Sequence, residues 1–250
     1  MKSSEETIAQ SRAQIDECIA LIKALYVARK RIVFVGDSDG VVTSSDSDAL
    51  GRVVKGEDSL ANRFALEERL ALQPLRPGPW LPIAERCARI GASIYIVTAR
   101  STFANPRLLW FCLEHDIPAE WILGVGHQSK RGSYEIILRE YANDPDCHFI
   151  YADDSLRHME DFQKLIAELG IEDRCHVFHA IPIFDHTEEE YRAYYDAVMN
   201  ATASSMLDAV SVNVPGFGEL LVVPDRRAGL KRIQEEYRKS LLAAAALLAE

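Results

Sequence analysis

Residues 31–40 read RIVFVGDSDG, and they indicate the fold of this chain more clearly than any other stretch. The run from Arg31 to Val35 is short, apolar and rich in β-branched side chains, which is typical of a strand buried on both faces of a parallel sheet. The run ends at a glycine followed by acidic residues, as expected where a strand stops at a polar loop. The sequence therefore predicts a buried strand with Asp37 and Asp39 at its carboxyl end.

The same strand pattern recurs along the chain and alternates with helical periods. Further strands are predicted at 93–97, 120–123, 148–151 and 175–181, and helices at 81–89, 105–115, 133–142 and 157–169. Alternation of this kind predicts βαβ units, and hence a parallel sheet with helices on both faces. We therefore expect an α/β fold with a Rossmann-like, doubly wound parallel sheet.

The regions around this sheet are predicted as additions to a single domain over 1–250, because 250 residues fit one large core. An amphipathic helix leads at 1–30, and the core covers 31–185 with a small cap inserted at about 43–80. The cap segment is broken by prolines and predicts short helices at 50–54 and 59–72. The extension at 186–250 predicts a helix at 187–200, a strand at 219–223 and a closing helix at about 226–249 that packs on the sheet or meets a partner subunit in a homodimer.

The charge balance argues against a nucleic-acid polymer as partner. The chain has 28 Lys and Arg against 38 Asp and Glu, for a net charge of −10, and it has no concentrated basic run. No apolar run approaches the ~18–20 residues of a membrane span, and the first residues lack the pattern of a signal peptide. We expect a cytoplasmic protein with no membrane partner.

Several common catalytic signatures do not occur in the sequence. Five scattered cysteines include no CxxC pair, so neither a zinc site nor a complete disulfide framework is indicated. The chain has no phosphate-binding GxxxxGK[ST], no complete GxGxxG at a strand-to-helix turn, no HExxH and no nucleophile elbow.

Polar residues instead follow the predicted strands in order along the chain. Asp37 and Asp39 follow the first strand, Thr98 follows the second, Lys130 precedes a helix, and Asp153–Asp154 follow a later strand. Each residue alone is equally compatible with a turn, a helix cap or a solvated charge. Together they are expected to converge, because open α/β sheets bind ligands at the carboxyl ends of their strands.

This set of side chains suits phosphoryl transfer. Converging carboxylates repel one another, and a hard divalent cation such as Mg²⁺ is the natural way to hold them. One carboxylate can attack phosphorus, and a second acid in the same loop can protonate the leaving alkoxide. A threonine hydroxyl and a lysine ammonium can bind the phosphoryl oxygens.

The order and spacing of these residues resemble the four motifs of the haloacid dehalogenase superfamily of phosphohydrolases. The resemblance implies that Asp37 is the nucleophile and that Asp39 is the general acid and base. It implies that Thr98 and Lys130 bind phosphate. It also implies a Mg²⁺ site made by Asp37, Asp153, Asp154 and the backbone carbonyl of Asp39.

A narrower likeness is to the cytosolic type I 5′-nucleotidases. It is carried by DSDGVVTSSDSD at 37–48, PLRPGP at 74–79, YIVTARS at 95–101 and GHQSK at 126–130. This resemblance implies a nucleoside monophosphate substrate, with Arg100 and Ser101 beside the phosphate and Ser44 and Asp46 near the nucleoside. His127 is a further substrate-contact candidate, because it lies close to Lys130 in the sequence.

The leading hypothesis is a Mg²⁺-dependent phosphomonoesterase that forms an aspartyl-phosphate and acts on nucleoside monophosphates. One alternative is a phosphatase or phosphotransferase for another small phosphate ester, since the same intermediate can pass to a different acceptor. The other is a non-catalytic binding module on the same scaffold, with the terminal helices as interaction surfaces.

Overall fold

A computed structural model describes residues 2–53, 66–70, 73–100, 105–126, 128–201, 209–224 and 239. The chain divides into two compact units. The core unit comprises Glu5–Ser44 and Pro77–Ile183. The accessory unit comprises the described parts of Met1–Ser4, Ser45–Arg76 and Phe184–Glu250, so that much of the segment predicted as a cap belongs with the carboxyl-terminal extension.

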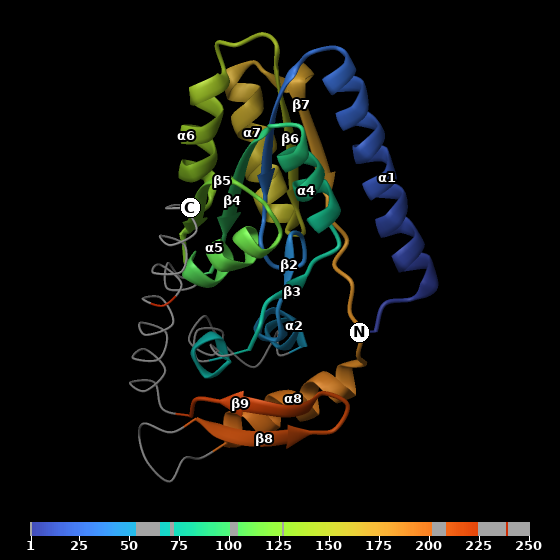
Figure 1. Ribbon diagram of the computed structural model, residues 1–250, viewed down its shortest axis with the longest axis vertical. Helices are drawn as coiled ribbons and strands as arrows, with labels where there is room; N and C mark the ends of the chain where they lie inside the picture. The colour runs from blue at the N-terminus through green and yellow to red at the C-terminus, as the bar shows by residue number, and fades with distance from the viewer. Residues whose placement is uncertain are drawn as a thin grey trace. The chain divides into compact units, whose positions relative to one another are not determined.

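A five-stranded parallel sheet lies at the centre of the core unit (Figure 1), in the order β5-β4-β1-β6-β7. Its strands are β1 (Arg31–Gly36), β4 (Ser93–Thr98), β5 (Ala119–Gly124), β6 (Cys147–Asp153) and β7 (Cys175–His179). The sequence winds outward from β1 in both directions, so the switch point lies between β1 and β6. Ligands of doubly wound sheets bind at the carboxyl ends of the strands at such a point. The predicted fold class is confirmed.

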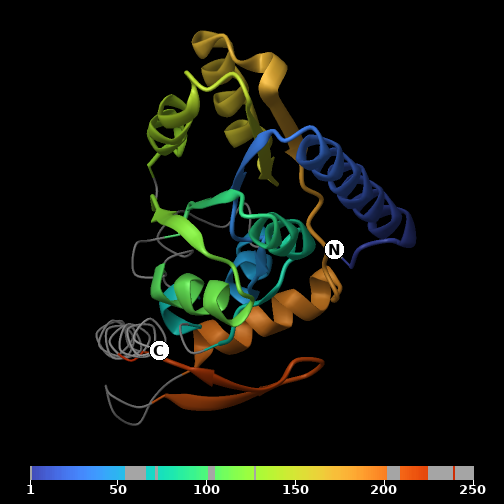
Figure 2. The same cartoon turned by 45° about the horizontal axis from the view of Figure 1, so that its top comes forward.

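Helices cover both faces of this sheet (Figures 1 and 2). They are α1 (Glu5–Val27), α4 (Leu81–Arg89), α5 (Asn105–Glu114), α6 (Arg131–Tyr141) and α7 (Leu156–Leu169), with a short 3₁₀ turn at Glu172–Arg174. Alternate residues of β1 explain the two faces, because Val33 and Val35 belong to a buried cluster with side chains of α6 and α7. On the other face, α1 and α4 pack against β1. The strands are apolar on both sides because both sides are covered.

The accessory unit is built around a small apolar core of its own. Its elements are α2 (Asp46–Val53), α8 (Glu188–Asn200), β8 (Val210–Val214) and β9 (Gly218–Val222), and residues 66–69 are helical. The strands β8 and β9 form an antiparallel hairpin, and α8 lies beside it (Figure 2). Leu50 of α2, Tyr194 of α8 and Val222 of β9 belong to one buried cluster. The chain passes from one unit to the other at two short strands that pair with each other, β2 (Thr43–Ser44) and β3 (Arg76–Pro77).

Most predicted elements are confirmed to within a few residues. The helix predicted at 187–200 is α8, and the strand predicted at 219–223 is β9, whereas β8 was not predicted. The closing helix at 226–249 and most of the helix at 59–72 lie outside the described residues. Within the described part of the chain, no helix combines the length and apolar character needed to cross a bilayer.

Candidate active site

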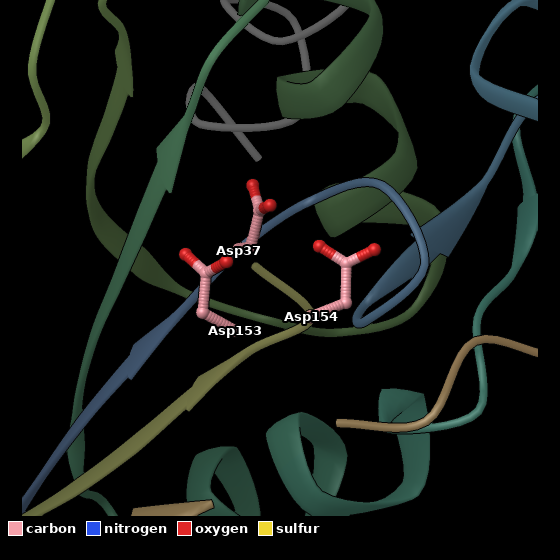
Figure 3. Close-up of side chains that lie close together, drawn as sticks. All are labelled: Asp37, Asp153 and Asp154. Atoms are coloured by element: carbon pink, nitrogen blue, oxygen red, sulfur yellow. The ribbon is translucent and has the colours of Figure 1, made fainter. Parts of the chain in front are cut away.

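Strand register brings two of the predicted acids side by side. Gly36 of β1 pairs with Ala152 of β6, and the Asp37 N–H donates to the Ala152 carbonyl at 2.9 Å. Asp37 and Asp153 therefore leave adjacent strands at the same level, at the switch point of the sheet. Figure 3 shows their carboxylates with that of Asp154, all pointing beyond the strand ends. One carboxylate oxygen from each of the three lies within 4.8 Å of the others.

The loop after β1 is held in a tight turn by its own hydrogen bonds. Gly40 adopts a φ of 74°, which favours glycine, and its N–H donates to the Thr43 carbonyl at 2.9 Å. The Ser38 and Thr43 hydroxyls lie 2.8 Å apart. The segment at Gly78 crosses very close to this turn, because a Cβ at that position would lie 2.2 Å from the Val41 carbonyl oxygen. The positions of Asp37 and Asp39 are thus determined by backbone packing.

Lys130, which directly precedes α6, bridges Asp37 and Asp153. Its Nζ lies 2.9 Å from Asp37 Oδ1 and 2.8 Å from Asp153 Oδ2, and the side chain is fully buried. Burial opposes the charged form of Lys130, but Asp37 and Asp153 together raise its pKa, so it stays an ammonium. Burial, reinforced by the charges of Asp153 and Asp154, raises the pKa of Asp37 against the pull of Lys130. More positive charge at this site would favour the Asp37 carboxylate.

Two buried tyrosines complete the surroundings of Asp153, and neither was predicted as a site residue. The Tyr134 and Tyr151 hydroxyls donate to Asp153 Oδ2 at 3.2 and 3.1 Å. Asp153 Oδ1 accepts from the Ser155 N–H at 2.9 Å. Burial would raise the pKa of Asp153, but Lys130 and His158 outweigh it and hold that pKa below its usual value. Tyr134 lies four residues after Lys130, and this helical spacing was the available signal.

Asp39 lies outside the cluster of three carboxylates and pairs with Arg100 instead. Arg100 Nε and Nη2 lie 2.5 and 2.6 Å from Asp39 Oδ2 and Oδ1. Thr98 ends β4 as predicted, is buried, and accepts the Arg100 N–H at its Oγ1 at 3.2 Å. The resemblance to the 5′-nucleotidases implied a place for Arg100 beside the phosphate, and it did not imply the pairing with Asp39 that the structure shows.

The other predicted substrate contacts are only partly described. Ser44 ends β2 and is half-buried. Asp46 begins α2, where its carboxylate is 2.5 Å from Arg76 Nη2 and accepts the Tyr194 hydroxyl at 2.9 Å. Ser101 and His127 lie outside the described residues.

Two histidines near the acids were not predicted as site residues. His158 Nδ1 lies 3.5 Å from Asp153 Oδ1. The Nε2 of His179, at the end of β7, donates to the Asp154 carbonyl at 3.1 Å. The His179 contact helps to fix the chain at the residue whose carboxylate belongs to the candidate metal cluster.

The residues present fit a divalent cation. Asp37, Asp153 and Asp154 offer hard carboxylate oxygens, and their spacing is close to the span of a site in which oxygens lie ~2.1 Å from Mg²⁺. The nearby Lys130 supplies one positive charge against three carboxylates. The net negative charge that remains at this edge of the sheet suits a cation whose other ligands are water and substrate oxygens.

The comparisons with known proteins return one weak structural likeness. No protein-family model matches the chain, and no curated protein matches it in sequence. The structure is similar to that of the class C acid phosphatase from Bacillus anthracis, with a TM-score of 0.48 and 14% sequence identity. The match covers 81% of this chain and 94% of that one.

Proposed function

We propose that this protein is a phosphomonoesterase that works through an aspartyl-phosphate on Asp37. The observation that carries the proposal is the fully buried Lys130, which bridges Asp37 and Asp153 at the edge where three carboxylates converge. A buried ammonium between two acids is expensive to maintain for stability alone. Its position suits a group that binds phosphoryl oxygens beside the attacking carboxylate.

Asp37 is the group placed to attack phosphorus. Its Oδ1 receives both the Lys130 ammonium at 2.9 Å and the Ser38 N–H at 2.6 Å, so among the described groups Oδ2 is the freer oxygen. Attack by a carboxylate oxygen forms the Asp37–phosphorus bond and breaks the bond to the ester oxygen. Water then attacks the same phosphorus, releases phosphate and restores the carboxylate.

Asp39 is the proposed proton donor and acceptor for these two displacements. It lies two residues beyond Asp37 in the same tight turn, so both side chains start from one rigid segment. Asp39 would give a proton to the leaving alkoxide and later take one from the attacking water. Thr98 and Lys130 would bind the oxygens of the transferring group.

The candidate cation site has a defined part in this proposal. Asp37, Asp153 and Asp154 would hold a Mg²⁺ ion together with the Asp39 carbonyl. When bound, the ion would offset the negative charge of the phosphoryl group and of these acids. Lys130 and His158 keep Asp153 ionised, and Tyr134 and Tyr151 also donate to its Oδ2.

We propose a nucleoside monophosphate as the substrate, on the basis of the motif resemblance. As the resemblance implies, Arg100 and Ser101 are proposed to contact the phosphate, Ser44 and Asp46 the nucleoside, and His127 the substrate. A small soluble ester suits a chain with a net charge of −10 better than a polyanion does.

Phosphate release from a panel of esters tests the proposal. Nucleoside monophosphates, sugar phosphates and an aryl phosphate are compared with Mg²⁺ and with a chelator. We expect metal-dependent release that is fastest from a nucleotide and falls at least ~10³-fold in Asp37→Asn, because the nucleophile is lost.

Asp146→Asn is the matched control, because Asp146 is an exposed acid at the opposite end of the sheet. Release that is fastest from another ester would keep the mechanism and reject the nucleotide. Full turnover by Asp37→Asn, or no release by the wild type from any ester, would reject the phosphomonoesterase itself.

A further inference from the structure

Arg100 makes a buried, two-pronged contact with Asp39. Its Nε lies 2.5 Å from Asp39 Oδ2 and its Nη2 lies 2.6 Å from Asp39 Oδ1. Both residues are buried, with 3% and 4% of their surfaces exposed. A planar guanidinium that contacts both oxygens determines the plane and the direction of a carboxylate, which a single point charge does not.

The backbone that carries Arg100 is itself anchored within the core unit. The Arg100 N–H donates to Thr98 Oγ1 at 3.2 Å, and its carbonyl accepts the Gly126 N–H at 2.8 Å. Arg100 is thus tied to the end of β4 and to the loop that follows β5. The guanidinium therefore reaches Asp39 from a backbone position that is held by hydrogen bonds on both sides.

The Asp39 turn is already closed without the help of Arg100. Backbone hydrogen bonds run from Gly40 N to Thr43 O and from Thr43 N to Ser38 O, at 2.9 and 2.8 Å. The Gly78 and Trp80 N–H groups donate to the Val42 and Val41 carbonyls from outside the turn. The contact with Arg100 is therefore not needed to shape the loop, and what it adds is the orientation of the Asp39 carboxylate.

We propose that Arg100 is a positioning residue that holds the Asp39 carboxylate in the orientation needed for proton exchange with the leaving group. The proposal rests on the proposed function and deepens it. A general acid acts only within hydrogen-bond reach of the leaving oxygen, so a carboxylate turned about its own axis loses effect even in an unchanged fold. Such a loss is largest where the leaving oxygen most needs a proton.

The choice of ester tests this role directly. An alkyl phosphate has a poor leaving group and depends on the acid, whereas an aryl phosphate with a stable phenolate depends on it much less. We expect Arg100→Gln to lower kcat on the alkyl ester about 10²-fold and on the aryl ester only a few-fold. Arg100→Lys keeps the positive charge but not the two-pronged contact. It should also lower kcat more on the alkyl ester than on the aryl ester, with a smaller loss than Arg100→Gln.

A double variant separates positioning from direct contact with phosphate. If Arg100 acts through Asp39, Arg100→Gln added to Asp39→Asn should cost little beyond Asp39→Asn alone. Arg139→Lys is the control, since it alters an exposed pair with Glu135 on α6 and should change neither ester. Thermal unfolding of each variant identifies any that fail to fold, and Arg100→Lys then carries the test.

The contrary outcomes are distinct from one another. Equal losses on both esters with a raised KM, and additive losses in the double variant, would make Arg100 a phosphate-binding group and overturn the positioning role. A lower melting temperature with unchanged kcat on both esters would leave it a purely structural residue. A wild type that hydrolyses neither ester would overturn the proposed function and this role together, whereas the first two outcomes leave the proposed function standing.

Discussion

The two ends of the central sheet carry similar charged groups in opposite surroundings. At the carboxyl end, Lys130 and Asp153 are both 0% exposed and lie 2.8 Å apart. At the amino end, Lys30 and Asp146 lie 2.5 Å apart, with side chains 32% and 68% exposed. Buried charges cost free energy to desolvate, and exposed pairs cost little and stabilise little. The contrast supports the proposal that the charges at the carboxyl end serve the proposed reaction.

Removal of the bridging lysine, Lys130, should change the free energy of unfolding more than any other substitution considered. Lys130→Met leaves Asp37 and Asp153 buried together without a counter-charge, so we expect unfolding to become easier by about 3–5 kcal/mol and turnover to be lost. Lys30→Met at the amino end should leave the same transition almost unchanged. Urea unfolding of both variants measures the comparison, and equal effects would abolish the distinction between the two ends.

Added Mg²⁺ should stabilise the folded protein through the acids at the carboxyl end of the sheet and not through those at the amino end. A ligand at a hundred times its dissociation constant stabilises the folded state by about 2.7 kcal/mol, so the melting temperature should rise with Mg²⁺. Asp154→Asn should remove most of this rise in melting temperature because it removes a carboxylate that would bind the ion. Asp146→Asn should leave the rise unchanged. A rise of the same size in Asp154→Asn would place the ion elsewhere.

The tyrosines around Asp153 should have a smaller effect. Tyr151→Phe removes a hydroxyl that donates to a buried carboxylate, which should cost about 1.5–3 kcal/mol. Tyr141→Phe is the matched control, because the Tyr141 hydroxyl bonds to the neutral Tyr95 hydroxyl at 2.8 Å and should cost about 1 kcal/mol. Denaturant unfolding compares the two, and a larger loss for Tyr141→Phe would contradict the importance assigned to Asp153.

The amino end should respond weakly to pH through a histidine pair. His148 Nδ1 and His176 Nε2 lie 3.3 Å apart on neighbouring strands. Burial lowers the pKa of both; nearby Lys30 and Arg174 add to this at His148, and His148 itself at His176. In the unfolded chain a histidine titrates near pH 6.5. The contribution of the two histidines to the free energy of unfolding is therefore complete above about pH 6.5, and it is lost as the pH falls through their lower pKa values in the folded state.

The double variant His148→Gln, His176→Gln isolates this contribution. Its melting temperature should fall less than that of the wild type between about pH 7.5 and pH 5, because glutamine takes up no proton. An identical fall in both proteins would mean that the pair titrates alike in the folded and unfolded states.

The sequence predicted the parallel sheet and the strand ends because both are local signals. A continuous apolar run such as 31–35 needs cover on both faces wherever it lies, and Asp37, Thr98 and Asp153 each follow such a run. The strand β8 was missed although its five residues, VSVNV, alternate apolar and polar side chains. Such a short run is a weak signal by itself, and its last residue, Val214, is buried only by packing in the cluster that includes side chains of α8.

Tertiary structure decided which charges meet. The sequence alone indicated that Asp37, Asp39, Lys130 and Asp153 lie at the same edge of the sheet, because parallel strands share their direction. It did not indicate that Lys130 bridges Asp37 and Asp153, or that Arg100 pairs with Asp39, since such contacts depend on register and on side-chain reach. Strand polarity is repeated along the chain, whereas the pairing of buried charges exists only once the strands are packed side by side.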